Sequence, residues 1–193
     1  QLSGNGDLSA SDRSENGGPA PSLPVRPPVL CAGCGHRGVF YTLSKLGLIV
    51  TGDIGCYTLG ALRPLESMDA CLCMGASIGM AHGMEAALRA AGDERRVVGV
   101  IGDSTFIHSG MTGLMDAINE DTAITVILVD NATVGMTGGQ PTAATGDKLY
   151  NIVLGLGTPV DHLIRLDPVP KKRDEVREAM ELELSLSTFE LTE

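Results

Sequence analysis

The chain contains no tryptophan, and aromatic residues make up only 3% of its 193 residues. Because hydrophobic residues still account for 43%, a core has to be built from Val, Ile, Leu, Met and Ala. Lys and Arg number 14 against 24 acidic residues, and the resulting formal charge of −10 argues against a nucleic-acid partner. No apolar run has the length of a membrane span and no segment has the pattern of a signal peptide, so we predict a soluble, cytoplasmic protein.

Both ends of the sequence have the character of a piece of a longer protein. Residues 1–24 are rich in Gly, Ser, Pro and acidic residues, a composition that cannot bury enough apolar surface to order itself. We therefore predict a disordered interdomain linker over residues 1–28 and one domain over residues 29–193. Residues 187–192 (STFELT) predict a strand that is not followed by a turn, so the domain is expected to be truncated there.

Short β-branched runs alternate with helical patterns along the domain. This alternation predicts an α/β fold, a doubly wound and mostly parallel sheet with helices on both faces. Strands are predicted at residues 48–51, 97–101, 124–129 and 163–166, helices at 39–45, 75–91, 109–119 and 172–184, and a loop at 134–146.

Polar turns follow the first three predicted strands. They read GDIG at residues 52–55, GDST at 102–105 and DNAT at 130–133. In open parallel sheets, ligands bind outside the carboxyl ends of the strands. The three turns therefore predict one site.

The turn Gly102-Asp103-Ser104 combines a close backbone approach, a hard oxygen ligand and a hydroxyl at a helix start, where anions bind. By itself this is ordinary turn chemistry. Asn131, however, follows the next strand, so its amide oxygen and the Asp103 carboxylate are expected to lie at neighbouring strand ends. Together they would form half of the octahedral oxygen shell that Mg²⁺ prefers.

Basic side chains are missing from these turns. Residues 52–56, 102–106 and 131–140 contain no Lys or Arg, and the chain has neither a GK[ST] phosphate loop nor a GxGxxG dinucleotide fingerprint after these strands. A divalent metal and backbone N–H groups remain as the means of holding a diphosphate here.

The order GDS, helix, strand and Asn resembles the motif of thiamine-diphosphate enzymes, usually written GDG, with Ser104 in place of the last glycine. The resemblance implies that Asp103 and Asn131 bind Mg²⁺ by their side chains and Thr133 by its carbonyl. It also implies cofactor contacts from the following residues: Gly52, Asp53, Ile54, Cys56, Met74, Gly75, Ser77, Gly102, Asp103, Ser104, Thr105, Asn131, Met136, Thr137 and Gly138.

Four further segments narrow the resemblance to the 2-oxoacid:ferredoxin oxidoreductases, and among them to the large subunits of the indolepyruvate type. They are CAGCGHRG at residues 31–38, TGDIGCYTLGALRPL at 51–65, CMGASIGMAHGME at 73–85 and MTGGQPT at 136–142. The resemblance implies a thiamine-diphosphate-binding fold and oxidative decarboxylation of an aryl 2-oxoacid to acyl-CoA, with CoA and ferredoxin as further partners. It also implies a β subunit and a separate pyrimidine-binding domain, without which this chain would hold half a site and be inactive.

The five cysteines are odd in number, which argues against a disulfide framework. The family resemblance makes Cys31, Cys34 and Cys56 candidate ligands of a [4Fe–4S] cluster whose fourth ligand is not evident. Cys71 and Cys73 are predicted to be packed thiols. His36 and His108 are candidates for contact with the diphosphate or the substrate carboxylate, against the alternative of loop histidines satisfied by backbone groups.

Two other functions are compatible with parts of this pattern. A non-oxidative thiamine-diphosphate enzyme of the acetolactate-synthase or decarboxylase type would share the GDS-to-Asn motif, but the cysteine loop counts against it. A non-catalytic Fe–S electron-transfer module would share the cysteines, but the pairing of Asp103 with Asn131 counts against that.

Overall fold

A computed structural model describes residue 24, residues 27–168 and residues 170–186, and it contains a four-stranded parallel sheet in the order β2-β1-β3-β4. The predicted linker and the predicted strand at 187–192 therefore lie wholly or mostly outside the described residues. The strands are β1 (Ile49–Gly52), β2 (Ala70–Cys71), β3 (Val97–Gly102), β4 (Ile124–Val129), and a small antiparallel pair, β5 (Thr133–Val134) and β6 (Gln140–Pro141). The helices are α1 (His36–Leu46), η1 (Cys56–Ala61), α2 (Ala76–Ala91), α3 (Asp103–Thr105), η2 (Phe106–Gly110), α4 (Met111–Asn119), η3 (Gly135–Thr137), α5 (Gly146–Gly155), η4 (Val160–His162), η5 (Pro170–Lys172) and α6 (Arg173–Leu186).

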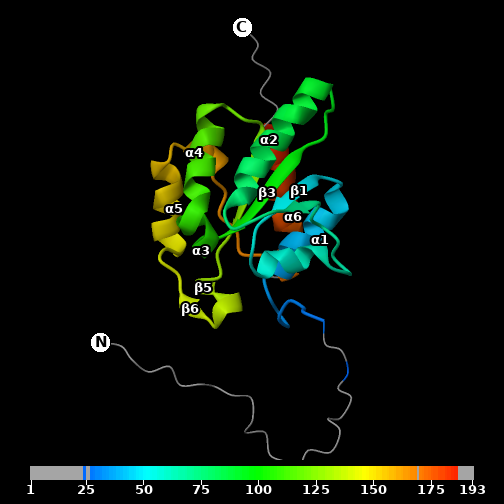
Figure 1. Ribbon diagram of the computed structural model, residues 1–193, viewed down its shortest axis with the longest axis vertical. Coiled ribbons are helices and arrows are strands. Elements are labelled where there is room, and N and C mark those ends of the chain that lie inside the picture. Colours follow the sequence, from blue (N-terminus) through cyan, green and yellow to red (C-terminus); the bar gives the residue numbers. More distant parts are fainter. Residues whose placement is uncertain (1–23, 25–26, 169, 187–193) are drawn as a thin grey trace, which may run out of the picture.

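Strand β3 is the centre of the sheet, and all of its residues are buried. Alternate side chains point to opposite faces, so Val98 and Val100 join one core cluster while Ile101 joins the other. The first cluster is completed by α1 and α6, and the second by α2, α4 and α5. Figure 1 shows α2 crossing in front of β3, with α4 and α5 beside it. The predicted doubly wound α/β fold is confirmed.

Three local predictions differ from the structure. Residues 163–166 do not form a strand, and no described strand pairs with their backbone. The predicted loop at 134–146 contains the β5–β6 pair, and Thr137 stabilises it by donating its hydroxyl to Gln140 Oε1 at 2.6 Å. Helix α5 was not predicted; it begins at Gly146, which adopts a left-handed φ of 55°.

The helix after β3 begins earlier than predicted and is composite. It starts at Asp103, passes through the π-helix η2, and continues as α4. A π-turn holds one residue more than an α-turn, and such turns are frequent at functional sites. Within the described residues, no helix is long and apolar enough to span a membrane.

Candidate functional site

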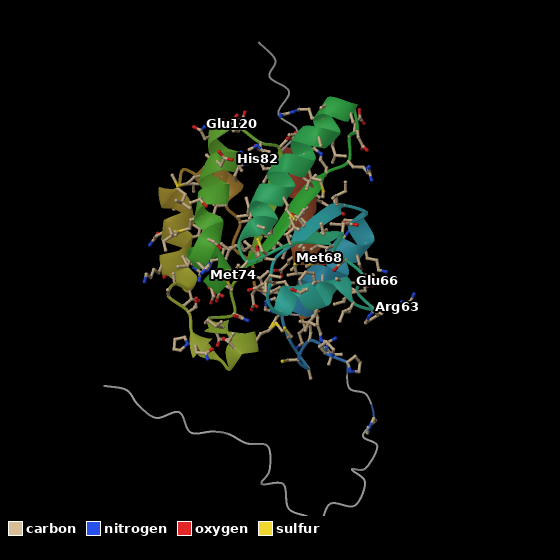
Figure 2. All side chains as sticks on the ribbon, viewed as in Figure 1. Arg63, Glu66, Met68, Met74, His82 and Glu120 are labelled. Atoms are coloured by element: carbon tan, nitrogen blue, oxygen red, sulfur yellow. The ribbon has the colours of Figure 1, made fainter. Side chains whose placement is uncertain are left out.

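The carboxyl ends of β3 and β4 meet at one edge of the sheet. Gly102 is the register partner of Val129, so the residues that follow each strand, Asp103 and Asp130, are brought together. Met74 lies well away from Glu120, toward the β5–β6 side of the molecule (Figure 2), and its carbonyl accepts a hydrogen bond from Ser109 of η2. The predicted convergence of the strand ends is therefore present in the structure.

Asp103 is buried but only partly satisfied. It is 1% exposed, and its Oδ1 accepts a hydrogen bond from the Ser104 N–H at 2.5 Å. Its Oδ2 and the Ser104 hydroxyl are both buried and have no partner. Burial raises the pKa of Asp103, and the neighbouring Asp130 carboxyl adds to that rise. Two unpartnered polar atoms in one turn indicate a place where a ligand or an ion completes the bonding.

Asp130 is a site residue that sequence reasoning missed. Its carboxylate accepts hydrogen bonds from Thr145 Oγ1 at 2.6 Å, from Gly146 N at 2.7 Å and from Ala132 N at 3.0 Å. Burial alone would raise the pKa of Asp130, but these donors lower it. The start of α5 is thereby fixed to the end of β4. No local signal could have shown this, because the donors at 145 and 146 are remote in sequence.

The remaining predicted metal ligands, Asn131 and Thr133, lie in the turn that leads into β5. Asn131 Oδ1 accepts the N–H of Thr133 at 3.1 Å, and the Asn131 side chain is exposed. Strand β5 packs against α3, which carries Asp103 and Ser104. The turn that includes Met136, Thr137 and Gly138 follows directly, with Met136 exposed. The predicted metal and diphosphate residues thus lie on α3 and on the turns that precede and follow the neighbouring β5.

Asp53 has a different role from the predicted cofactor contact. It is fully buried, and its carboxylate accepts hydrogen bonds from the N–H groups of Ile54, Gly75 and Ser77 at 2.8, 2.8 and 3.1 Å. Both oxygens are therefore used inside the protein. Asp53 holds the turn after β1 against the start of α2, and we regard it as a positioning residue.

The other predicted cofactor residues divide in the same way. Ser77 and Thr105 are buried supports, as is Gly52, whose Cα faces the side chain of Met68. Thr105 donates its hydroxyl to the Ile54 carbonyl at 3.4 Å, which connects the first two turns. The residues that expose apolar side chains or backbone at this edge are Ile54, Met74, Gly75 and Met136.

Tyr57 is a second site residue that was missed. It lies in η1, is buried, and places its hydroxyl against Gly102. Burial raises the pKa of Tyr57, and the carboxylate of Asp103 adds to this rise. A hydrogen bond with Thr105 acts in the opposite direction. The Tyr57 ring thus packs against Gly102 and supports the turn that carries Asp103. The sequence showed only a tyrosine after a cysteine, and nothing linked it to position 102.

A side chain at position 102 would collide with this ring. We expect Gly102→Ala to lower the free energy of unfolding by about 1–3 kcal/mol, the usual cost of overpacking. Gly79→Ala is the matched control, since it lies in α2 with open space around its Cα and should stabilise the helix by about 0.5–1 kcal/mol. Urea unfolding of both variants measures this; equal effects would mean that Tyr57 moves aside freely.

The cysteines Cys31, Cys34 and Cys56 lie within electrostatic reach of one another. Burial raises the pKa of Cys56, and the charges of Cys34 and Cys31 raise it further. Among the described residues, however, no group of three or more His, Cys, Asp or Glu side chains converges closely enough to hold a metal ion. The three thiols are therefore not arranged as a closed ligand set. Cys71 is half-buried, but Cys73 is exposed, so the prediction of a packed thiol is wrong for Cys73.

The two candidate histidines lie in contrasting surroundings. His36 is buried, contacts the Cys34 sulfur through Nδ1 at 3.0 Å and packs its ring on Tyr57. Burial lowers the pKa of His36, and its Nε2 is buried without a hydrogen-bond partner, so the ring lies inside the loop. His108 is exposed on η2, and its Nδ1 contacts Ser109 Oγ, which donates to the Met74 carbonyl at 3.1 Å. Of the two, His108 alone is accessible at the edge.

Comparison with protein families shows which family the chain belongs to. Residues 53–163, which include Asp103, Asp130 and Asn131, match the model of the thiamine pyrophosphate enzyme, C-terminal TPP binding domain. The chain belongs to the thiamine pyrophosphate enzymes. Its thiamine pyrophosphate domain is the unit described above, and the predicted thiamine-diphosphate-binding fold is confirmed.

Curated relatives of this thiamine pyrophosphate domain carry one name. "Indolepyruvate oxidoreductase subunit IorA" of Archaeoglobus fulgidus is 36% identical over 83% of this chain, and that of Methanothermobacter marburgensis is 45% identical over 66%. The protein of Pyrococcus horikoshii is 43% identical over 65%. The chain spans 21–27% of the length of these relatives.

Solved structures agree on the fold of the thiamine pyrophosphate domain. A benzoylformate decarboxylase from Polynucleobacter necessarius aligns with a TM-score of 0.61 at 14% identity, over 77% of this chain and 30% of that one. A 2-oxoglutarate:ferredoxin oxidoreductase from Magnetococcus marinus aligns with a TM-score of 0.58 at 19% identity, over 90% of this chain and 65% of that one. At these identities the likeness establishes the fold alone.

Proposed function

We propose that this chain is the diphosphate-binding half of the active site of a 2-oxoacid:ferredoxin oxidoreductase of the indolepyruvate type. The observation that carries the proposal is the buried Asp103 with an unpartnered Oδ2, beside an unpartnered Ser104 hydroxyl, at the meeting of two strand ends. The names and identities of the curated relatives support the indolepyruvate type.

The residues at this edge fit a magnesium diphosphate. Asp103 and Asn131 would supply hard oxygen ligands and Thr133 a backbone carbonyl, while Ser104 and the turn from Met136 to Gly138 would donate to phosphate oxygens. Asp130 lies too near Asp103 for both to be ionised at low cost, and a divalent cation would remove that conflict. When bound, thiamine diphosphate supplies the carbanion chemistry for decarboxylating a 2-oxoacid.

The other half of the site would come from elsewhere. Apolar side chains stand exposed around the carboxyl edge, among them Ile54, Leu72, Met74 and Met136. An exposed apolar set of this kind suits burial against another protein surface. We propose that the pyrimidine-binding domain of the longer subunit and a β subunit cover it, and that the chain alone is inactive.

The finer assignments rest on the resemblance. We propose an aryl 2-oxoacid as substrate, CoA as acyl acceptor, ferredoxin as electron acceptor and the cytoplasm as location. We also propose that Cys31, Cys34 and Cys56 contribute to a [4Fe–4S] site in the longer subunit, although the described residues form no closed ligand set and no step is assigned to it.

Calorimetric titration of thiamine diphosphate under anaerobic conditions tests the site. Binding should require Mg²⁺, and Asn131→Ala should weaken it by about 10-fold or more, the loss expected for one metal-ligand contact. Asn119→Ala, at an asparagine that is also exposed and ends α4, should leave it unchanged. The full-length subunit is titrated in parallel, since half a site binds more weakly than a whole one. Absence of binding in both proteins would refute the proposal.

A further inference from the structure

The part of the sequence that builds the carboxyl edge of β3 and β4 is poor in basic side chains. Residues 97–147 run from β3 to the start of α5 and contain no Lys or Arg, and His108 is their single histidine. The same stretch supplies two carboxyl groups to the edge, Asp103 and Asp130. Because a 2-oxoacid is an anion, a side chain that can carry a positive charge here bears directly on how such a substrate is held.

The ring of His108 is oriented by a relay of hydrogen bonds. The Ser109 hydroxyl donates to the Met74 carbonyl at 3.1 Å, and its oxygen lies 3.0 Å from His108 Nδ1. A hydroxyl carries one hydrogen and the Met74 carbonyl receives it, so Nδ1 has to be the donor to Ser109. The neutral ring is therefore the Nδ1–H tautomer. Its other nitrogen, Nε2, is left for a ligand, on a side chain that is exposed.

The far end of this relay is held in place by the fold. Gly75 follows Met74 with a left-handed φ of 85°, and a Cβ at position 75 would collide with the Ser109 hydroxyl. The N–H of Gly75 donates to the buried Asp53 at 2.8 Å, which fixes the backbone beside the Met74 carbonyl. The start of α2 and η2 are thus in close contact, and the glycine is required by that contact as well as by its φ.

His108 lies about one helical turn beyond Ser104, a residue of the proposed diphosphate site. Ser104 comes four residues earlier in the continuous helical segment of α3 and η2, and residues at this spacing share one face of a helix. Because side chains on a helix lean toward its N-terminus, the ring of His108 leans toward the turn of Ser104. The Ser104 hydroxyl is buried and has no partner, which indicates that a ligand completes the bonding of that turn.

We propose that His108 binds the carboxylate of the 2-oxoacid through Nε2–H, and that Ser109 and Gly75 are positioning residues for His108. The inference rests on the proposed function, which places a 2-oxoacid at this edge. In the relay, Nδ1 donates to Ser109 whether the ring is neutral or charged. A proton taken up by the ring is therefore carried on Nε2, where it forms a charge-assisted hydrogen bond to the carboxylate.

NMR spectra of the chain with ¹⁵N-labelled histidine test the relay without any ligand. At a pH where the rings are neutral, His108 should show the Nδ1–H tautomer, and His108→Gln identifies its signals. Ser109→Ala should change His108 to the Nε2–H tautomer, which predominates in free histidine. Ser44→Ala is the matched control, because this hydroxyl also donates to a backbone carbonyl, that of Tyr41 on α1. An Nε2–H tautomer in the unsubstituted chain would overturn the proposal.

Kinetics of the full-length subunit with its β subunit test the role in substrate binding. His108→Gln should raise the KM for indole-3-pyruvate about 10-fold or more, the loss of one hydrogen bond to a charged group, with a smaller change in kcat. The Mg²⁺-dependent affinity for thiamine diphosphate, measured by calorimetry, should stay unchanged. His82→Gln, at a histidine of α2 that faces Asp116, should leave all three quantities unchanged.

The calorimetric measurement separates this inference from the proposed function. Thiamine diphosphate binding with a KM that His108→Gln does not alter would overturn the role of His108 alone. A weakened affinity for thiamine diphosphate with an unchanged KM would also overturn it, because His108 would then contact the diphosphate. Absence of thiamine diphosphate binding in the unsubstituted protein would overturn the proposed function, and the carboxylate site with it.

Discussion

Asp53→Asn is expected to lower the free energy of unfolding by about 2–4 kcal/mol, among the largest effects of a single isosteric change in this chain. The carboxylate accepts three backbone N–H groups, and an amide has only one oxygen with which to accept them. Its NH₂ group would face at least one of those N–H donors. A buried donor without an acceptor costs far more than an exposed hydrogen bond contributes.

Asp116→Asn provides the matched control for Asp53→Asn. Asp116→Asn removes the same charge, but from a side chain that is 70% exposed and whose Oδ2 lies 3.6 Å from His82 Nδ1. The expected change in the free energy of unfolding therefore stays within about 0.5 kcal/mol. Urea unfolding measures both, and hydrogen exchange should show the Asp53→Asn damage at the Gly75 and Ser77 amides. Equal stability of the two variants would mean that Asp53 does not anchor α2.

Asp103→Asn is expected to raise the free energy of unfolding of the unliganded chain, the opposite of Asp53→Asn. It is also expected to remove the metal site. Asp103 lies buried beside Asp130, so an amide in its place relieves the repulsion between two carboxyl groups. We expect stability to rise by on the order of 1 kcal/mol. Thiamine diphosphate should then bind about 100-fold more weakly in Mg²⁺, a loss of about 2.8 kcal/mol.

The pH dependence of that gain is fixed by the direction of the pKa shift. Burial raises the pKa of Asp103 in the folded chain above its value in the unfolded chain. Its protonated form therefore favours folding, and this contribution is complete below the ordinary Asp pKa and is lost as pH rises through the folded pKa. The advantage of Asp103→Asn should grow across the same range. A gain independent of pH would show that Asp103 is ionised without penalty.

Much of the fold could be predicted because the hydrophobic periodicity and the composition of a short segment are enough to indicate a strand or a helix. Residues 97–101 are β-branched except for Gly99 and lie in the fully buried β3, while Gly102 and Asp103 mark its end. The strand ends converge because parallel strands share an edge, so the turns that follow β3 and β4 could be placed side by side from spacing alone.

What could not be predicted depends on contacts between remote segments. Asp53 reads as one more polar turn residue, and only the folded chain shows that its oxygens are used by the start of α2. Tyr57 beneath Gly102 and Asp130 at the start of α5 belong to the same class. Residues 163–166 have the composition of a strand, but a strand also needs a neighbour within hydrogen-bonding distance.

The composite helix that begins at Asp103 has a consequence for how the site is aimed. The extra residue of η2 turns everything before it relative to α4, whose buried face is fixed by Leu114 and Ala117. The direction of the Asp103 carboxylate is therefore determined partly by the number of residues between the site and the core, and not only by their identities. Inserting or deleting a residue in η2 would change the direction of the Asp103 carboxylate, although every residue of the site would still be present.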